Sequence, residues 1–545
     1  MITHEVFNQV PPLVDYDVFG TDPVLSGAVE REGARWALDL LGEFGRAAGT
    51  AEMFDAGRLA NEHEPTLRTH DRVGNRIDEV EFHPAYHRFM ELSISNGLHS
   101  LPYERPPGEG GRVARDAAFM VVNQVEAGHS CPISMTTAVV PALRAEPGLA
   151  ASWEPKILSR EYEAPLGPLS AKAGVTMGMG MTEKQGGSDV RANTSVATPI
   201  GDGAYELVGH KWFVSAPMSD GFLVTAQAPG GITCFLLPRV LEDGTRNHVR
   251  VQRLKDKLGN RSNASSEMEF ERAVVYQVGE EGRGVRTIIE MVNNTRLDCV
   301  VGSVGLMRQA LAQAAWHAEH RVAFAAALID KELMQNVLAD LEVEVEVATL
   351  LMMRLSGAFD RASLDPAEEA FRRLATPVIK FWVSKRCTGV VREAMECLGG
   401  NGYAEESVMP RLFRESPVNA IWEGSGNVIA LDTLRAMATA PASFEAFVQE
   451  LDGARGSDAR LDRAIDRLGS AVAEMAGGEA GARRLVEQLA TTLGAALAVR
   501  FGDPAVADAF VASRLAGDHG YLYGTLDPSL PLGDIARRAV PVTVT

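Results

Sequence analysis

The chain has 545 residues and a formal net charge of −19, with 46% hydrophobic and 23% charged residues. This length exceeds what one core supports, so several packed units are expected, and the acidic balance argues against a whole-molecule attraction to nucleic acid or anionic membrane. The five cysteines are scattered and lack CxxC spacing, and no apolar run approaches the roughly 20 residues of a membrane span, so we expect a cytoplasmic protein.

The sequence changes character three times, which predicts four domains. Residues 1–171 carry helical periodicity, clearest over 29–49 and 83–100, between Pro and Gly clusters. Residues 172–282 hold short runs of β-branched and aromatic residues separated by Gly and Asp turns, and these predict a small β-barrel.

The second half of the chain is helical by its periodicity. Residues 283–437 contain long helical stretches, the first of which, 286–324, is long enough for two helices; with 333–359 and 367–399 they would make a four-helix bundle. Residues 438–545 form an additional helical domain, with helices expected over 444–451, 461–475 and 482–499 before a Gly/Pro-rich tail. The expected fold class is therefore α+β.

One segment within the bundle gives conflicting signals. Leu341–Val347 alternates apolar residues with Glu, which is a strand pattern. The flanking segments 334–338 and 350–355 continue a helix, so we predict a helix through this segment.

The loop at residues 181–190, Met-Thr-Glu-Lys-Gln-Gly-Gly-Ser-Asp-Val, is the most informative motif. Gly186 and Gly187 allow positive φ and a close approach of backbone N–H groups to an anion, and Ser188 adds a neutral donor. Thr182 can turn its hydroxyl toward a heteroaromatic ring. The loop suits a phosphate-bearing, partly aromatic cofactor, although taken alone its residues favour an ordinary turn.

Two further segments carry residues suited to chemistry. The run 209–215, Gly-His-Lys-Trp-Phe-Val-Ser, predicts an aromatic strand that walls off a planar ring or fills a barrel core. The run 421–427, Ile-Trp-Glu-Gly-Ser-Gly-Asn, places Glu423 between an aromatic residue and a Gly-Ser-Gly turn, where a partly desolvated carboxylate suits a general base. A surface glutamate at a helix terminus is the alternative interpretation.

In order and spacing these segments resemble the acyl-CoA dehydrogenase family of flavoproteins, over nearly the whole helical–β–helical part of the chain. Further matching motifs are Lys257–Arg261, Thr295-Arg296, Arg321 with Phe324, Leu398–Tyr403 and Pro410–Arg414. Within the family the chain is most similar to the AidB-like branch, on residues 181–189, 209–213 and 254–265 and on its C-terminal extension.

The resemblance implies FAD as the cofactor. Thr182 would hydrogen-bond the isoalloxazine edge and Ser188 the pyrophosphate, while Phe213 would lie against the ring and Ser215 near its reactive nitrogen. The other cofactor-binding residues implied near these and near the base are Met181, Gly187, Val214, Trp422, Gly424, Ser425 and Asn427.

A second group of residues would serve the cofactor of a neighbouring subunit. Arg321 and Phe324 match the family pair with this role, as do Gly400 and Gly402 by close backbone approach. A shared cofactor site makes oligomerisation part of cofactor binding, and the resemblance implies a homotetramer.

Glu423 matches the general base, which removes a proton α to a thioester while hydride passes from the β carbon to the flavin, and Arg296 would lie near it. The expected protein is an FAD-dependent acyl-CoA dehydrogenase-like oxidoreductase acting on an acyl-CoA or similar thioester. Trp422 stands where the family usually has Tyr, which narrows or reshapes the acyl channel. The acyl chain and the electron acceptor stay open, and an oxidase or a relative acting on small nitro compounds is an alternative on the same scaffold; Glu423, rather than a shorter Asp, favours thioesters.

The alternative function is a DNA-binding flavoprotein of the alkylation-damage response with little dehydrogenase activity, as in the AidB-like branch. Residues 438–545 contain 10 Arg, no Lys and 14 Asp plus Glu, so the DNA interpretation is disfavoured. Arg455, Arg460, Arg463 and Arg467 could form a basic stripe, but the i,i+3 pairs Arg455–Asp458 and Arg463–Asp466 favour a salt-bridged, solvated face.

No metal site is predicted. His83 and His87 lie four residues apart, but Pro84 stands between them and no third ligand follows at metal spacing. Packing or pocket lining is the favoured role of these two histidines.

Overall fold

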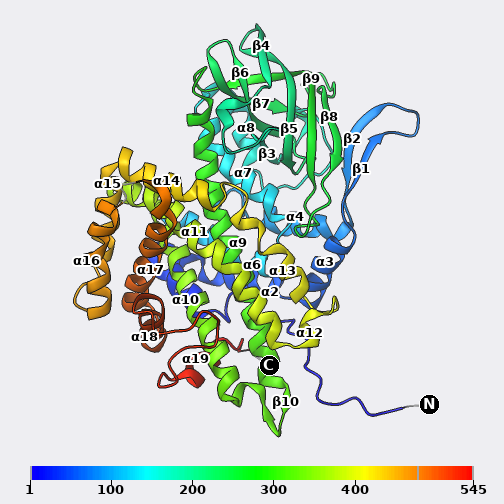
Figure 1. Cartoon of the computed structure of the whole chain (residues 1–545). Helices are drawn as coiled ribbons and strands as arrows, with labels where there is room; N and C mark the ends of the chain where they lie inside the picture. The colour runs from blue at the N-terminus through cyan, green and yellow to red at the C-terminus, as the bar shows by residue number, and fades with distance from the viewer. Residues whose placement is uncertain (1–2, 475–477, 543–545) are drawn as a thin grey trace. The chain divides into compact units, whose positions relative to one another are not determined.

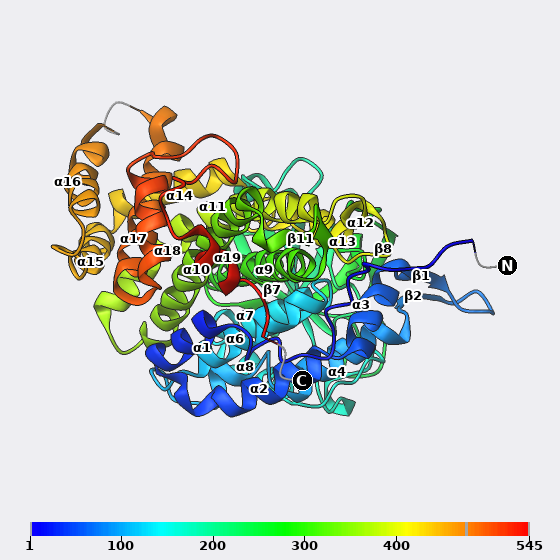
Figure 2. The ribbon, with the colours of Figure 1, turned by 90° about the horizontal axis from the view of Figure 1, so that it is seen from below.

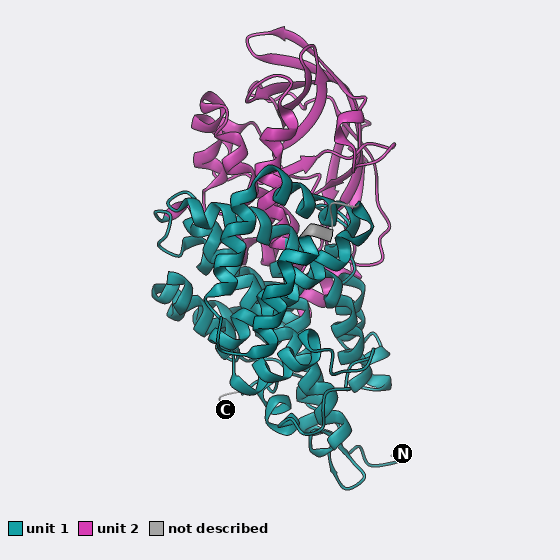
Figure 3. Ribbon diagram, turned by 60° about the vertical axis from the view of Figure 1, so that its left-hand side comes forward, with its two compact units in different colours: residues 1–54, 105–125, 299–545 teal, residues 55–104, 126–298 magenta. Residues whose placement is uncertain are grey.

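The computed structural model describes residues 3–474 and 478–542 and divides into two compact units, shown in Figure 3. Unit 1 comprises residues 1–54, 105–125 and 299–545, and unit 2 comprises residues 55–104 and 126–298. Two helices, α3 (Ala51–Glu62) and α9 (Gly284–His320), carry the chain across a unit boundary. The predicted division into four domains remains a prediction.

Unit 2 contains a closed β-barrel, drawn in green in Figure 1. Its strands are β3 (Met177–Gly180), β4 (Val196–Gly201), β5 (Ala204–Ser215), β6 (Gly221–Ala228), β7 (Gly231–Pro238), β8 (Val249–Leu254) and β9 (Ser265–Val278). The order β6-β4-β5-β9-β7 returns to β6 through the pairing of β6 with β7, while β3 extends the sheet at β6 and β8 pairs with β9. Apolar side chains from alternate positions fill the interior, and the predicted small β-barrel is confirmed.

Helices α4 (Pro84–Ser95), α5 (Leu101–Glu104), α7 (Ser130–Leu143) and α8 (Pro147–Ile157) complete unit 2, together with a hairpin of β1 (Thr66–His70) and β2 (Arg76–Glu81). The sequence analysis missed this hairpin because its strands are short and largely polar. The predicted helix over 83–100 ends early, at Ser95. His83 caps this helix and stacks on His63, and His87 hydrogen-bonds the Tyr162 hydroxyl at 2.8 Å, so both histidines have packing roles.

Long helices build unit 1. α10 (Glu332–Arg361) packs against α11 (Pro366–Cys397), and α14 (Gly426–Thr439) packs against α11 as well, as Figures 1 and 2 show. The expectation of two helices over 286–324 is wrong: α9 runs unbroken to His320, and the hairpin β10 (Val322–Ala323) and β11 (Ala326–Ala327) follows it. The single long helix α9 and the helix α14 are therefore two of the four helices of the predicted bundle.

The other helices of unit 1 are α1 (Pro23–Val29), α2 (Leu38–Ala48), α6 (Gly111–Val125), α12 (Gly400–Tyr403), α13 (Met409–Glu415), α15 (Pro441–Asp452), α16 (Ala459–Glu474), α17 (Ala482–Phe501), α18 (Pro504–Phe510) and α19 (Leu532–Arg538). The predicted helix over 29–49 is interrupted, because Gly33 has φ +96° between α1 and α2. The three predicted C-terminal helices are confirmed, apart from Met475, which lies outside the described residues. Helices α18 and α19 were missed in the tail.

The alternating segment Leu341–Val347 lies in α10, which confirms the predicted helix. Residues two apart on a helix lie about 200° apart, so Glu344 points away from Glu342 and Glu346. Two of these buried acids are paired with arginines: Glu344 pairs with Arg386 (2.6 Å) and Arg514 (2.7 Å), and Glu346 pairs with Arg538 (3.0 Å). Alternation is compatible with a helix here because arginines lie on more than one side of it.

The predicted salt-bridged face of the C-terminal region is present, with different partners. Arg455 pairs with Asp452 and Asp466, and Arg460 pairs with Asp458 and Asp508. The predicted i,i+3 partners were wrong: Arg455 and Asp458 both lie before α16, and on α16 Asp466 pairs with Arg455 instead of Arg463. Among the described helices, none combines the length and the apolar character needed to cross a membrane.

Candidate active site

The loop 181–190 follows β3 in unit 2 and is held in a tight turn. Gly186 has φ +140°, where a larger residue would be strained, and a Cβ on Gly187 would lie 2.3 Å from Thr182 Oγ1, where it would clash. Met181 and Thr182 are partly buried, while Gly187 and Ser188 are exposed. The glycine pair thus folds the loop onto Thr182 and leaves its outer edge, with Ser188, open to solvent.

A buried ion pair that the sequence analysis missed anchors this loop. Glu183 and Lys211 are both fully buried and lie 2.8 Å apart. The Glu183 carboxylate also accepts hydrogen bonds from the backbone N–H groups of Thr194 and Ser195. Burial alone would raise the pKa of Glu183, but the bonds from Lys211 and Thr194 hold that pKa well below its usual range. The loop is therefore fixed to β5 by a charge that stays ionised.

Strand β5 ends beside the same loop. The Trp212 N–H donates to the Thr182 carbonyl at 2.8 Å, so the structure brings the two predicted segments together. Phe213 is 56% exposed, Val214 is buried at 1%, and the Ser215 hydroxyl lies 3.2 Å from that of Ser265. The ring of Phe213 and the hydroxyl of Ser215 are available on this edge, whereas Val214 offers only its backbone.

Lys255 covers the aromatic pair on this strand. Its ammonium lies 3.4 Å from the centroid of the Trp212 ring and 4.6 Å from that of Phe213, and it pairs with Glu267 at 2.6 Å. Such cation–π contacts hold an aromatic ring in one orientation. Lys255 therefore restrains the ring that the resemblance assigns to the flavin.

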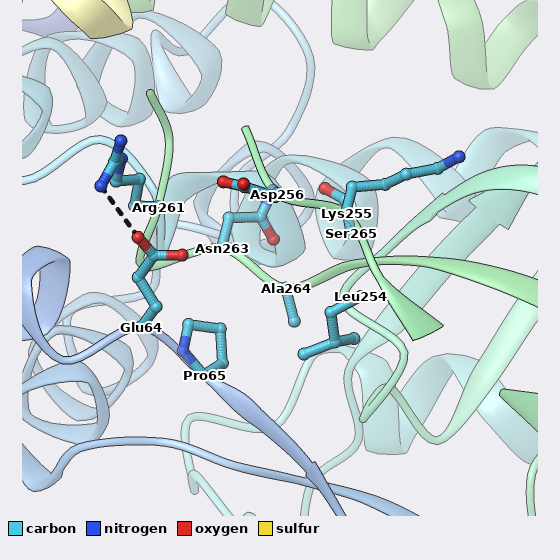
Figure 4. Close-up of a pocket in the computed structure, with 9 residues that line it drawn as sticks. All are labelled: Glu64, Pro65, Leu254, Lys255, Asp256, Arg261, Asn263, Ala264 and Ser265. Carbon is cyan, nitrogen blue, oxygen red and sulfur yellow. Dashed lines mark hydrogen bonds and ion pairs between the residues drawn. The ribbon is translucent and has the colours of Figure 1, made fainter. Parts of the chain in front are cut away.

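A cavity of about 170 Å³ lies next to this cluster and is lined by residues 64–65, 254–256, 261 and 263–265, drawn in Figure 4. The ion pair between Arg261 and Glu64 (3.0 Å) crosses one side of it, and the Lys255 side chain points away from it. A volume of this size is below the roughly 300 Å³ of small-molecule sites. Two residues that line the cavity contact predicted cofactor residues: Ser265 contacts Ser215, and Lys255 contacts Phe213.

Arg296 lies in α9, in the part that belongs to unit 2, and is buried at 6% exposure. The residues predicted to serve a neighbouring subunit lie in unit 1. Phe324 forms the turn of the β10–β11 hairpin with φ +51° and is 95% exposed, while Arg321 donates to the carbonyl of Asn8. An aromatic side chain so exposed at a hairpin tip is well placed to contact another molecule.

The glycines of the 398–403 motif differ from each other. A Cβ on Gly402 would lie 2.2 Å from the Met395 carbonyl, which makes this residue necessary for the fold of α12. Gly400 is exposed, and nothing lies within 4 Å of a Cβ built on it. Gly400 therefore leaves room for a close backbone approach, while Gly402 is explained by packing.

The Glu423 turn is the most constrained segment among the predicted residues of unit 1. Glu423 has φ +57° and Gly424 φ +109°, and Ser425 precedes the first turn of α14. The Glu423 Oε2 atom is buried, and the indole N–H of Trp422 donates to Asn419 Oδ1 at 3.0 Å. Asn427 accepts a hydrogen bond from Arg483 of the C-terminal region at 3.3 Å.

A second buried lysine, Lys380 of α11, holds this turn. Its ammonium donates to the carbonyls of Trp422 (3.0 Å) and Gly424 (2.6 Å), and the residue is 1% exposed. The sequence analysis missed it, because the only signal was a lysine within an otherwise apolar stretch of a predicted helix. Glu183 and Lys211 were missed because they belong to two different predicted segments, and nothing in the sequence pairs them.

Comparison with known proteins gives the family. The description "Adaptive response protein AidB N-terminal domain" matches residues 8–164, "Acyl-CoA dehydrogenase, middle domain" matches 178–273 and "Acyl-CoA dehydrogenase, C-terminal domain" matches 282–438. The chain is 45% identical to the Escherichia coli protein named "Putative acyl-CoA dehydrogenase AidB", over 93% of this chain and 94% of that one.

More distant relatives agree. The chain is 31% identical to acyl-CoA dehydrogenase family member 11 of Caenorhabditis elegans, over 86% of this chain and 78% of that one. The crystal structure of C. elegans ACDH-11 in complex with C11-CoA superposes with a TM-score of 0.85 at 27% identity, covering 95% of this chain and 94% of that one. The chain therefore belongs to the acyl-CoA dehydrogenase family of FAD-dependent oxidoreductases and, within it, to the AidB-like branch.

Proposed function

We propose that this chain is an FAD-dependent acyl-CoA dehydrogenase in which Glu423 removes the α proton of an acyl-CoA thioester. The observation that carries the proposal is the backbone of the Glu423 turn. A left-handed conformation at a residue other than glycine costs about 1 kcal/mol and persists only where the surroundings enforce it, which is typical of functional sites.

The residues of unit 2 fit the cofactor. Phe213 keeps most of its ring exposed although its neighbour Val214 is fully buried, and the turn at Gly186 and Gly187 opens the Ser188 edge of the loop. Met181, Thr182, Gly187, Ser188, Phe213, Val214 and Ser215 would hold FAD here, with Trp422, Gly424, Ser425 and Asn427 contributing from the turn around the base. FAD, when bound, accepts the hydride equivalent from the β carbon.

Three further residues of this chain act at or near the α carbon of the substrate. Glu423 takes the proton, and Arg296 shapes the charge around that base. The Trp422 indole, oriented by its bond to Asn419, narrows the acyl channel. The C11-CoA bound in the nematode relative supports an acyl-CoA as the substrate class.

The proposal extends to assembly. Arg321, Phe324, Gly400 and Gly402 hold the cofactor of a neighbouring subunit in a cytoplasmic homotetramer. The exposed Phe324 ring and the open backbone at Gly400 support this arrangement.

An anaerobic titration of the purified flavoprotein with short, branched and long acyl-CoA thioesters tests the reaction. We expect one chain class to bleach the flavin, and Glu423→Gln to retain FAD while slowing bleaching by about 10²- to 10⁴-fold. The exposed Glu406→Gln is the matched control and should behave as wild type. If no acyl-CoA bleaches a flavin that dithionite reduces, the proposed reaction is wrong; if Glu423→Gln loses FAD, the residue has a structural role.

A further inference from the structure

Lys380 contacts the chain on both sides of Glu423 in the same turn. Its ammonium nitrogen lies within 3.0 Å of the Trp422 carbonyl oxygen and 2.6 Å of the Gly424 carbonyl oxygen. In an extended strand, carbonyl oxygens two residues apart lie about 7 Å from each other, too far for one nitrogen to reach both at these distances. A single ammonium group therefore requires the chain to bend between residues 422 and 424.

The bend coincides with the strained backbone. Glu423 and Gly424 both have positive φ, and only glycine adopts this region without a steric cost. Two hydrogen bonds from a cation to neutral carbonyls are stronger than neutral ones, and they are made where Lys380 is shielded from water. These bonds offset the cost of the left-handed conformation at Glu423.

Lys380 is itself fixed. It lies in the middle of α11, and the Ser384 hydroxyl donates to its carbonyl at 2.6 Å. A lysine on a long packed helix has less freedom than one on a loop. The position of the Glu423 carboxylate is therefore determined by α11, through Lys380, rather than by the turn alone.

We propose that Lys380 is the positioning residue of Glu423: it holds the turn 422–424 in the conformation that presents the carboxylate to the α carbon. This inference rests on the proposed function for its chemical meaning, but its structural content is independent of turnover. Removing the ammonium should release the turn and misplace the base, while the contacts proposed for the residues of unit 2 keep FAD bound.

The chain supplies a matched control in unit 2. Lys172 is 2% exposed and also donates to two carbonyls two residues apart, those of Glu163 and Pro165, both at 2.6 Å. Lys172 also pairs with the buried Asp220 at 3.1 Å. Lys172→Met therefore removes these two bonds and a buried ion pair as well, so it reports at least the general destabilisation expected from losing a buried lysine. It should leave the 422–424 turn unchanged.

The experiment compares Lys380→Met with wild type and Lys172→Met as FAD-bound full-length proteins, by hydrogen–deuterium exchange of peptides covering 421–427. We expect exchange there to rise at least about tenfold in Lys380→Met only. The limiting rate of flavin reduction by acyl-CoA should fall about 10²-fold, as expected for misplacement by about 1 Å, with the half-saturating acyl-CoA concentration within threefold of wild type.

Lys380→Gln, which keeps N–H donors on a shorter side chain, should show an intermediate exchange rate, and it serves alone if Lys380→Met does not fold. Wild-type exchange over 421–427 in either variant overturns the proposal, as does increased exchange with an unchanged rate of flavin reduction. If wild type itself is not reduced by any acyl-CoA, the proposed function fails, and faster exchange confined to this turn still assigns Lys380 as its anchor.

Discussion

Glu342 lies in the middle of α10 at 6% exposure, where burial raises its pKa to about 8 and Arg308 only partly offsets the rise. The same carboxyl titrates near about 4.3 in an unfolded chain, so between these two pH values the folded protein holds a proton that the unfolded chain has released. The free energy of unfolding should therefore fall as the pH rises from about 4 to about 8.

Glu342→Gln is expected to remove this slope and to stabilise the protein at pH 8.5 by on the order of 2–4 kcal/mol, since each unit of pKa shift corresponds to about 1.4 kcal/mol. Melting temperatures of the two proteins between pH 5 and pH 9 check the prediction. Equal slopes would show that the Glu342 carboxyl is not the group that titrates.

Glu344, two residues along α10, is the natural contrast. Burial would raise its pKa, but Arg386 and Arg514 lower it to about 2. Its stabilising contribution is present above about pH 4 and is lost as the pH falls toward 2, which is the opposite sign to that of Glu342. Glu344→Gln should destabilise the protein at neutral pH, where Glu342→Gln does not.

At the residue scale, the sequence predicts the proposed catalytic and cofactor-binding residues better than the residues that hold them in position. Glu423, Thr182 and Phe213 stand in motifs that are contiguous in the sequence. Lys380 and Lys211 act on carbonyl or carboxylate groups tens of residues away, and one sequence contains no signal that pairs positions so far apart. Their function depends on the packing of one element against another.

At the scale of elements, α10 shows both the strength and the limit of periodicity. The helix was predicted from its flanks, and the alternation of Leu341–Val347 was explained only when the arginines of α11, α19 and the segment after α18 were found against its carboxylates. The hairpins β1–β2 and β10–β11 were missed because strands of two to six residues hold too few positions for a period to emerge. The barrel was predicted because several short strands repeat between turns.

The ion pairs of Arg514 dock the C-terminal region onto α10, and they give a prediction at this scale. Arg514 is 6% exposed and pairs with Asp340 and Glu344, both of which are buried. Removing one member of a buried pair leaves an uncompensated charge, so Arg514→Met should cost about 3–5 kcal/mol. Thermal unfolding followed by tryptophan fluorescence measures this cost.

Arg537→Met is the matched control for Arg514→Met. Arg537 pairs with Asp330, but both side chains are about half exposed, and such surface pairs contribute at most about 1 kcal/mol. If Arg514→Met unfolds at the temperature of Arg537→Met, the buried pairs do not hold the C-terminal region in place.

At the scale of the whole molecule, six of the ten arginines of residues 438–545 form ion pairs within the chain, while Arg463, Arg467, Arg483 and Arg484 are exposed. Arg455, Arg460, Arg500, Arg514, Arg537 and Arg538 all form ion pairs with carboxylates. Non-specific DNA affinity depends on Lys and Arg groups available to phosphates. The arrangement therefore favours a role in packing for this region and agrees with the acidic balance of residues 438–545.

The exposed side chain of Phe324 allows the proposed assembly of subunits to be tested. The ring is 95% exposed at a hairpin tip whose two central residues both have positive φ. An exposed aromatic on a well-defined turn is a typical interface anchor, and truncating such an anchor usually costs more than 1 kcal/mol.

Phe324→Ala should therefore weaken FAD retention by about fivefold to thirtyfold, because a cofactor shared between subunits couples flavin affinity to assembly. The test is gel filtration with light scattering and flavin absorbance, over a hundredfold range of protein concentration. As the variant is diluted, the molar mass of the assembly and its flavin content should fall together. Tyr521→Ala, which removes an equally exposed aromatic from the C-terminal region, is the control and should match wild type. If Phe324→Ala keeps both its flavin and its mass at every concentration, the hairpin does not serve the cofactor of a neighbouring subunit.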